Sequence, residues 1–376
     1  MNTNKHLLFI NSMYGGGAER IMLILAQSLA DAGKEVWLVT RKGEETDFYK
    51  ADSRIHRISL SSGLVHGKLK AWIRVFADVW ALRTIIKKHA IGNVFAMMPI
   101  ESIISIVATA GLSSRLIVAE RNYPPAEPFG RVWHFLRKHL YKYPELVAVQ
   151  TQGIANWVLE HTRAKRVEII PNPVSYPLSP NSPVVPPADY IVQGQQFFLA
   201  VGSKARQKGF DMLVEAFSTS APHHQWNLVI LGLDSNSGED ARQVELQIEE
   251  ANQKLGKQRI LAIKRAGNVG DWYACADAFV LSSRYEGFPN VLLEAMSYGL
   301  PVISFRCMTG PEDMITDGES GLLVEFENVP LLADGMVRLA QDVDFRKRLG
   351  SNATEVRQRF SREFILAKWL DLLIVK

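Results

Sequence analysis

The chain has 376 residues, more than one hydrophobic core usually supports, so its length predicts two domains. Hydrophobic residues make up 47% of the sequence and charged residues 22%, which is typical of a folded protein and excludes a disordered one. The net charge of +4 does not by itself indicate a nucleic-acid partner. Two cysteines, Cys275 and Cys307, are too few for a disulfide framework, and we expect both to be reduced, buried thiols.

Apolar segments of the sequence are too short to cross a membrane, and the first of them, residues 7–10, ends too early for a signal peptide. We therefore expect a cytoplasmic protein, free or held peripherally on the inner face of the cell membrane.

Residues 1–170 alternate short apolar runs with helical patterns, and a helix is expected at residues 18–32. Such alternation predicts an α/β domain in which helices cover both faces of a parallel, doubly wound, Rossmann-like sheet. The expected strands are residues 7–10, 35–40, 94–96, 116–119, 146–149 and 167–170.

Residues 171–190 are rich in proline, which disfavours helix and central strand and predicts a linker. The alternation restarts in residues 191–359, which predicts a second Rossmann-like domain and an interdomain cleft as the active site. Helices are expected at residues 210–218 and 238–254, and a final helix, residues 360–376, is expected to pack back on the first domain. The expected strands are residues 197–201, 228–231, 278–281, 302–304 and 321–324.

Residues 283–304 carry the strongest functional pattern, SRYEGFPNVLLEAMSYGLPVIS. A Gly-Phe-Pro turn precedes a helix that begins near Asn290 and directly follows a predicted strand. Free backbone N–H groups at such a helix start favour a phosphate. Glu286 and Glu294 flank this helix start, and their carboxylates can accept hydrogen bonds from the hydroxyls of a ribose or a sugar.

This string resembles the signature of the retaining family-4 glycosyltransferases, in which seven residues separate two glutamates in a Ser-x-x-Glu-Gly-Phe-Pro context. The resemblance implies a GT-B fold with two tandem Rossmann-like domains, of which the first holds the acceptor and the second holds the nucleotide-sugar donor. It also implies that Glu294 binds the ribose hydroxyls of a nucleotide-sugar donor and that Glu286 holds hydroxyls of the transferred sugar. Backbone N–H groups toward the sugar and diphosphate are implied for Gly287, Phe288, Asn290 and Val291.

A basic loop follows the first predicted strand of the second domain and contains Lys204, Arg206 and Lys208. Cations at the carboxyl end of a strand can neutralise a diphosphate leaving group, although a solvated loop has the same composition. The loop is similar to the family's Gly-Arg/Ser-x-x-x-x-Lys-Gly element, in which Lys208 matches the lysine. Ser203 stands where many members have arginine, and Arg206 is the candidate to supply that charge.

Two loops of the first domain are weaker candidates. The first is a glycine-rich loop that lacks the Gly-x-Gly-x-x-Gly spacing of dinucleotide-binding loops. It is similar to a family loop near the donor diphosphate and the acceptor, and the resemblance implies substrate-binding roles for Gly16, Gly17 and Glu19. The stretch VAERNYPP resembles a family variant at the position where many relatives have histidine, which makes Arg121 a candidate for the cleft. The structural alternative for the glycine-rich loop is a flexible turn that allows close helix packing, and the alternative for Arg121 is a salt bridge within its loop.

The resemblance further implies retention of anomeric configuration, a UDP-linked donor and no cofactor. The candidate site contains no Asp-x-Asp to hold a metal, so we expect no metal dependence.

Residues 66–89 and 131–143 are basic, aromatic and amphipathic, which suits contact with an anionic membrane, unless their aromatic residues face the core. We therefore predict a lipid-linked glycan acceptor of surface-polysaccharide, O-antigen or lipopolysaccharide assembly, and no nucleic-acid partner.

Three other functions remain possible from the sequence. A nucleotide-sugar epimerase uses the same architecture but needs no acceptor, and the Glu286–Glu294 pattern argues against it. A nicotinamide dehydrogenase is suggested only by the glycine loop, without the expected acidic residue after the second strand. A non-catalytic nucleotide-sugar-binding protein fits the same motifs, and only a transfer assay separates it from an enzyme.

Overall fold

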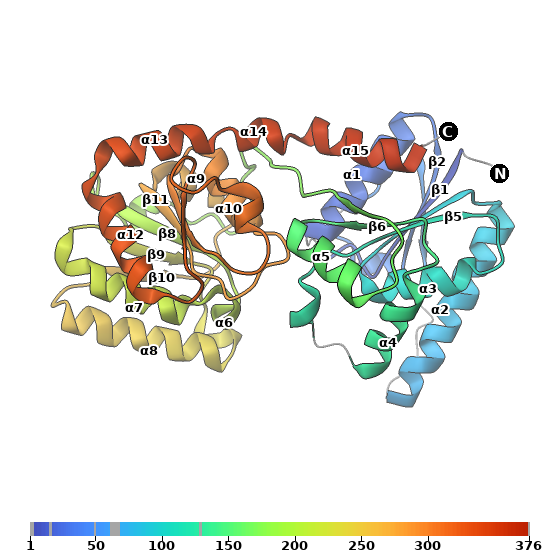
Figure 1. The fold of residues 1–376 in the computed structure, drawn as a ribbon, viewed down its shortest axis with the longest axis horizontal. Coiled ribbons are helices and arrows are strands. Elements are labelled where there is room, and N and C mark those ends of the chain that lie inside the picture. The colour runs from blue at the N-terminus through green and yellow to red at the C-terminus, as the bar shows by residue number, and fades with distance from the viewer. Residues whose placement is uncertain (1–3, 15–16, 49, 61–67, 128–129, 375–376) are drawn as a thin grey trace. The chain divides into compact units, whose positions relative to one another are not determined.

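The computed structural model describes residues 4–14, 17–48, 50–60, 68–127 and 130–374. The chain forms two compact units, each built on its own sheet (Figure 1). Unit 1 comprises Met1–Asn172 and Glu363–Lys376, and unit 2 comprises Pro173–Arg362.

Unit 1 contains a seven-stranded parallel sheet in the order β3-β2-β1-β4-β5-β6-β7. Its strands are β1 (Lys5–Ile10), β2 (Glu35–Thr40), β3 (Ile55–Ser59), β4 (Asn93–Met97), β5 (Arg115–Ala119), β6 (Leu146–Val149) and β7 (Val167–Ile169). Its helices are α1 (Gly17–Asp31), α2 (Lys68–His89), α3 (Pro99–Thr109), α4 (Arg131–Leu140), α5 (Gln152–His161) and α15 (Arg362–Ile374).

Side chains alternate between the two faces of this sheet, as the pleat of a strand requires. Leu7 and Phe9 join the core beneath α2, α3, α4 and α5, whereas Leu8 and Ile10 join the core beneath α1 and α15. Helix α15 therefore completes unit 1, although the chain reaches it only after passing through unit 2. Its Trp369 is fully buried and packs edge-on against Phe95, with ring centroids 5.0 Å apart.

Unit 2 contains a six-stranded parallel sheet in the order β10-β9-β8-β11-β12-β13. Its strands are β8 (Phe197–Val201), β9 (Asn227–Leu231), β10 (Ile260–Ile263), β11 (Ala278–Leu281), β12 (Val302–Phe305) and β13 (Leu322–Val324). Its helices are α6 (Ala205–Lys208), α7 (Phe210–Ser220), α8 (Glu239–Lys254), α9 (Val269–Cys275), α10 (Asn290–Ser297), α11 (Pro311–Met314), α12 (Val329–Gln341), α13 (Val343–Ala353) and α14 (Val356–Arg359).

The proline-rich segment packs against unit 2 from Pro173 onward. Its backbone makes sheet-like hydrogen bonds even though proline cannot donate one. The N–H of Asn181 donates to the carbonyl of Gly267 over 2.9 Å, and the N–H of Gly267 donates to the carbonyl of Pro183 over 2.6 Å. The indole of Trp272 donates to the carbonyl of Val185 over 2.9 Å, which fixes the end of the segment to α9.

The two parallel sheets with helices on both faces confirm the predicted α/β class. Two strands, β3 and β10, were not among those expected from the sequence. Each lies at an edge of its sheet. Polar residues interrupt the apolar run of β3, whereas β10 is wholly apolar and as long as the predicted β11. None of the helices in the described ranges is both long enough and apolar enough to cross a membrane.

Candidate functional site

The principal candidate site lies in unit 2, where β8 and β11 are neighbours and end at the same edge of the sheet. Ligands of open parallel sheets bind outside the carboxyl ends of the strands. The loop after β8 leads into α6, and the loop after β11 leads into α10, so both sequence motifs of unit 2 reach this edge.

Lys208 and Glu286 form an ion pair at this edge, although 78 residues separate them in the sequence. The Nζ of Lys208 lies 2.7 Å from Oε1 of Glu286, and their side chains are 13% and 6% exposed. Ser283 Oγ donates to the same Oε1 over 2.6 Å. Oε2 of Glu286 makes no hydrogen bond to the residues that the structure describes, so this oxygen is available to a ligand hydroxyl.

Gly209 sets the position of Lys208. Its φ of +62° ends α6 in the left-handed conformation that glycine adopts without strain. A Cβ at this position would lie 2.1 Å from the carbonyl oxygen of Ser282, so only glycine permits the approach to the loop after β11. The Ser282 hydroxyl donates to the carbonyl of Lys208 over 2.8 Å and joins the two loops.

Glu294, one turn inside α10, receives a hydrogen bond from a residue that the sequence did not single out. The hydroxyl of Tyr273, in α9, lies 3.2 Å from Glu294 Oε2 and 3.2 Å from the carbonyl oxygen of Val291. Burial and the neighbouring Glu294 carboxylate raise the pKa of Tyr273 well above its usual value, so its hydroxyl keeps the proton and acts as donor. Glu294 itself is half-buried.

The start of α10 differs in part from the sequence prediction. Phe288 is buried and packs edge-on against Phe360, and the N–H of Asn290 donates to the carbonyl of Phe288 over 2.9 Å. Val291 is half-buried on the first turn of the helix, and Gly287 is half-buried just before it. Gly287 and Val291 therefore keep some exposure near the start of α10, whereas the N–H of Asn290 is used within the chain.

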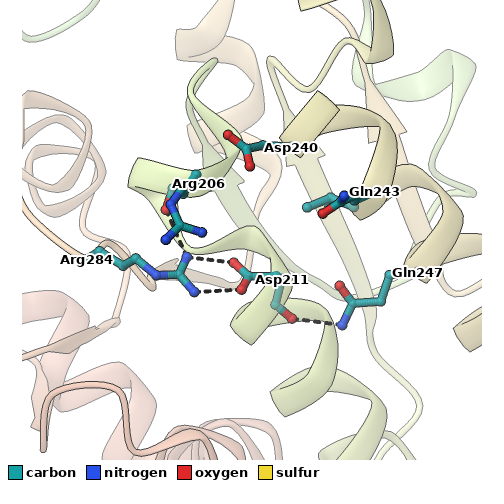
Figure 2. Close-up of a pocket in the computed structure, with 7 residues that line it drawn as sticks. Arg206, Asp211, Asp240, Gln243, Gln247 and Arg284 are labelled. Carbon is teal, nitrogen blue, oxygen red and sulfur yellow. Dashed lines mark hydrogen bonds and ion pairs between the residues drawn. The ribbon is translucent and has the colours of Figure 1, made fainter. Parts of the chain in front are cut away.

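Arg206 lies apart from the Lys208–Glu286 pair. It is exposed, and it lines a different hollow together with Asp211, Asp240 and Arg284 (Figure 2). Its carbonyl accepts a hydrogen bond from Arg284 over 2.9 Å. Two residues that lie two positions apart on the short helix α6 thus face different surroundings, and the sequence spacing did not reveal this.

The candidates from unit 1 have diverse surroundings. Gly16 lies outside the described residues, Gly17 is the exposed first residue of α1, and Glu19 is half-buried in its first turn. Arg121, directly after β5, is 6% exposed. Its guanidinium donates to the carbonyl of Ile170 over 3.2 Å and to the side-chain oxygen of Asn172, and burial lowers its pKa to about 9.

Among the described residues, no group of three or more histidine, cysteine, aspartate and glutamate side chains is arranged to hold a metal ion. One Asp-x-Asp does occur in the chain, at Asp342 and Asp344. Asp342 is the N-cap of α13, where its carboxylate accepts from the N–H of Phe345 over 2.9 Å. Metal independence stays a prediction. Both cysteines are free thiols, as the sequence predicted, but only Cys307 is buried, so the expectation of burial was wrong for Cys275.

Comparison with protein families matches both parts of the chain. Residues 187–356 match the family described as glycosyl transferases group 1, and residues 15–176 match glycosyltransferase family 4. The chain belongs to these glycosyltransferases. Membership confirms the resemblance to family-4 glycosyltransferases, and it favours a glycosyltransferase over the dehydrogenase and the epimerase.

Curated relatives and solved structures extend this result. The chain is 26% identical to the amylovoran biosynthesis glycosyltransferase AmsD of Erwinia amylovora over 95% of this chain and 96% of the relative. It is also 26% identical to a Campylobacter jejuni α-1,4-N-acetyl-D-galactosaminyltransferase, named for an acceptor linked to diphosphate-undecaprenol, over 97% and 96%. Anabaena HepE, solved with UDP and glucose, has the same fold, with a TM-score of 0.75, 18% identity and coverage of 99% and 100%.

Proposed function

We propose that this glycosyltransferase moves a sugar from a UDP-linked donor to a lipid-linked oligosaccharide, with retention of anomeric configuration and without a metal. The Lys208–Glu286 pair at the carboxyl ends of β8 and β11 carries the proposal. Two supporting observations are that HepE, which has the same fold, was solved with UDP, and that the Campylobacter relative is named for an undecaprenol-linked acceptor.

The chemistry assigns a distinct task to each side chain. Lys208 places a positive charge where the diphosphate leaves, and the N–H groups of Gly287 and Val291 add to it. Glu286 orients hydroxyls of the transferred sugar through Oε2, while Oε1 stays bound to Lys208 and Ser283. Glu294, oriented by Tyr273, binds the ribose hydroxyls. Arg206 is a further candidate to neutralise the charge of the diphosphate, but its exposed side chain must adopt another conformation to reach it.

In the proposed step, the acceptor hydroxyl attacks the anomeric carbon from the face on which the diphosphate departs. The new C–O bond forms as the bond to the diphosphate breaks, and a departing phosphate oxygen takes the acceptor proton. No carboxylate is needed as a covalent nucleophile, and the protein acts by positioning the reactants and stabilising negative charge.

A direct assay tests the proposal. Purified protein is incubated with a panel of UDP-, GDP- and ADP-sugars and a polyprenyl-diphosphate oligosaccharide, and products are read by mass spectrometry and by the NMR coupling of the new anomeric proton. We expect an α-linked product from a UDP-sugar, with undiminished rate in a chelator. A β-linked product contradicts retention. Loss of activity in the chelator and its recovery with manganese contradict metal independence.

We also propose peripheral contact of unit 1 with an anionic membrane. Helix α2 divides its apolar residues between two faces: Val79, Leu82 and Ile86 pack into the core, whereas Ile73, Phe76 and Trp80 point outward. Phe76 and Trp80 are each 72% exposed. On α4, Val132 and Phe135 are exposed as well. Residues 66 and 67 of the predicted basic segment lie outside the described residues.

The charge on α2 is suited to an anionic surface. Arg74, Arg83, Lys87 and Lys88 are not offset by an exposed acid, because Asp78, the helix's acidic residue, is buried and paired with Arg41 over 2.8 Å. Exposed aromatic residues beside cations are the features that bind helices to membrane interfaces.

Liposome flotation tests the membrane contact. Phe76→Ser with Trp80→Ser should release the protein from vesicles containing anionic lipid, since two large apolar side chains no longer enter the interface. Phe326→Ser with Leu331→Ser, which removes two exposed apolar side chains from unit 2, is the matched control. Equal flotation of both double variants contradicts this contact.

A further inference from the structure

A polar hollow lies beside the proposed donor site in unit 2, on the side covered by α7 and α8 (Figure 2). It has a larger chamber of about 470 Å³ and a smaller one of about 130 Å³. Arg206, Asp240 and Arg284 line both chambers. The larger volume falls within the range of about 300–1,000 Å³ that small-molecule sites occupy.

The hollow and the donor site share a thin wall. Two hydrogen bonds join the chain segments of this wall: Gln207 Nε2 donates to the carbonyl of Tyr285 over 3.2 Å, and the N–H of Arg284 donates to the carbonyl of Gln207 over 2.8 Å. Gln207 and Tyr285 line the hollow, whereas the next residue in each segment, Lys208 and Glu286, forms the donor-site ion pair. A ligand in the hollow therefore lies next to the reacting sugar.

One side of the hollow is rigid and the other carries side chains that are free to bind. Arg284 holds Asp211 through two hydrogen bonds of 2.8 and 2.6 Å. By contrast, the exposed side chains of Arg206, Asp240 and Gln243 make no hydrogen bond or ion pair with the residues that the structure describes. Figure 2 shows these three side chains around the same space, from α6 and α8.

The chemistry of these groups favours a saccharide over an anion. Arg284 is already neutralised by Asp211 and lies 3.5 Å from Glu327. The other charged residues that line the larger chamber are Lys204, Arg206 and Asp240. A guanidinium, a carboxylate and an amide together offer the mixture of donors and acceptors that sugar hydroxyls require, whereas a phosphate gains little beside a carboxylate.

We propose that this hollow binds a neutral saccharide unit of the acceptor glycan, next to the unit that receives the transferred sugar. This inference rests on the proposed glycosyl transfer and adds a specificity subsite to it. The subsite lets the enzyme distinguish acceptors by the length of their glycan, because a chain of one sugar cannot fill the hollow and the donor-side position at once.

The first test measures transfer to two polyprenyl-diphosphate acceptors that carry one or three sugars. The variant Asp240→Asn with Gln243→Ala should raise the KM for the three-sugar acceptor about tenfold, as expected for two lost hydrogen bonds, and leave the one-sugar acceptor and the donor KM unchanged. The matched control is Glu239→Gln with Gln253→Ala, which makes the same changes at exposed positions of α8 outside the hollow. An equal effect on both acceptors, or on both double variants, overturns the subsite.

The second test does not depend on transfer. Binding of neutral di-, tri- and tetrasaccharides is measured on a glycan array and by saturation-transfer NMR, with and without saturating UDP. We expect binding that UDP does not displace and that Asp240→Asn with Gln243→Ala weakens about tenfold. If transfer fails for every donor but this binding persists, the proposed function is wrong and the subsite stands. If transfer proceeds and no glycan binding depends on Asp240 and Gln243, the subsite is wrong.

Discussion

Both units place a buried tyrosine against a glutamate, yet the two glutamates have opposite surroundings. In unit 1, Tyr141 donates a hydrogen bond to Glu120, which directly follows β5, and both side chains are fully buried. In unit 2, Tyr273 is buried in the same way, but its acceptor Glu294 is half-buried and keeps contact with solvent.

The surroundings determine what each carboxylate can do. Glu120 is enclosed with Arg137, which lies 3.5 Å away and is shared with Glu127 at 3.2 Å. Burial raises the pKa of Glu120 to about 7, against the opposing attraction of Arg137. Because its side chain is fully buried and bound to Tyr141, Glu120 is expected to support the fold of unit 1. Glu294 has the same kind of partner and remains accessible, as a ligand-binding residue must.

Lys208 in unit 2 and Arg121 in unit 1 also differ in exposure and in their partners. Lys208 pairs with Glu286 and keeps 13% of its side chain exposed. Arg121 has no carboxylate partner among the described residues, and it is held by carbonyl and amide oxygens and by the ring of Trp369, 5.9 Å away. The two units thus share a fold, but the charged residues after their strands differ in surroundings: Lys208 and Glu294 in unit 2 keep some exposure, whereas Arg121 and Glu120 in unit 1 are buried.

Replacing Lys208 gives the largest expected effect. Lys208→Met should lower kcat/KM for transfer by about 10²–10³, the loss seen when one group that stabilises developing negative charge is removed. Folding should persist, because Glu286 keeps its hydrogen bond from Ser283. Initial rates and circular dichroism measure the two effects. Lys257→Met, at an exposed lysine that donates a hydrogen bond to Gln225, is the control. A change of less than threefold in Lys208→Met contradicts the assignment.

Replacing Glu120 should change how stability depends on pH. The unfolded chain loses this proton near pH 4.5, whereas the folded chain keeps it up to about pH 7. The free energy of unfolding therefore falls as pH rises through this window, by about 1.4 kcal/mol per pH unit for this group. Glu120→Gln removes that contribution, so denaturant titrations should show the variant gaining stability relative to wild type between pH 4.5 and 7.

Glu145 supplies a control of opposite sign for this experiment. Its hydrogen bond from Arg115 lowers its pKa, so its contribution is present above the unfolded pKa and is lost only in acid. Glu145→Gln should differ from wild type by a constant amount between pH 5 and 7. A constant difference for Glu120→Gln as well would mean that Glu120 is ionised throughout.

Replacing Arg121 should affect stability more than catalysis. Arg121→Lys removes the planar guanidinium that reaches both Ile170 and Asn172, and should lower the free energy of unfolding by about 2 kcal/mol. Below the melting transition, kcat/KM should change less than threefold. Thermal melts followed by activity at low temperature separate the effects, with the exposed Arg166→Lys as control. A large loss of kcat/KM with an unchanged melting temperature would place Arg121 in contact with substrate.

The sequence predicted the central strands and the residues that a known motif contains. Continuous apolar runs located strands such as β8 and β11, and the motif resemblance identified Glu286, Glu294 and Lys208. The edge strand β3 was missed because polar residues interrupt its apolar pattern. The edge strand β10 was missed although its four residues are all apolar, as in the predicted β11. The sequence also did not predict that the side chain of Arg206 lies apart from the Lys208–Glu286 pair, since spacing in the sequence does not determine which pocket a side chain lines.

Tyr273 is the clearest case of a residue that only the structure identifies, because it comes from α9 and no motif connects it with Glu294. Tyr273→Phe should raise the donor KM about fivefold with little change in kcat, since a ribose contact contributes equally before and during the reaction. Tyr298→Phe, which removes a hydroxyl bound to the N–H of Leu178, should leave the donor KM unchanged. With a donor lacking the ribose hydroxyls, the difference between wild type and Tyr273→Phe should disappear. A difference that persists with that donor would mean that Tyr273 acts through the packing of α9 and not through Glu294.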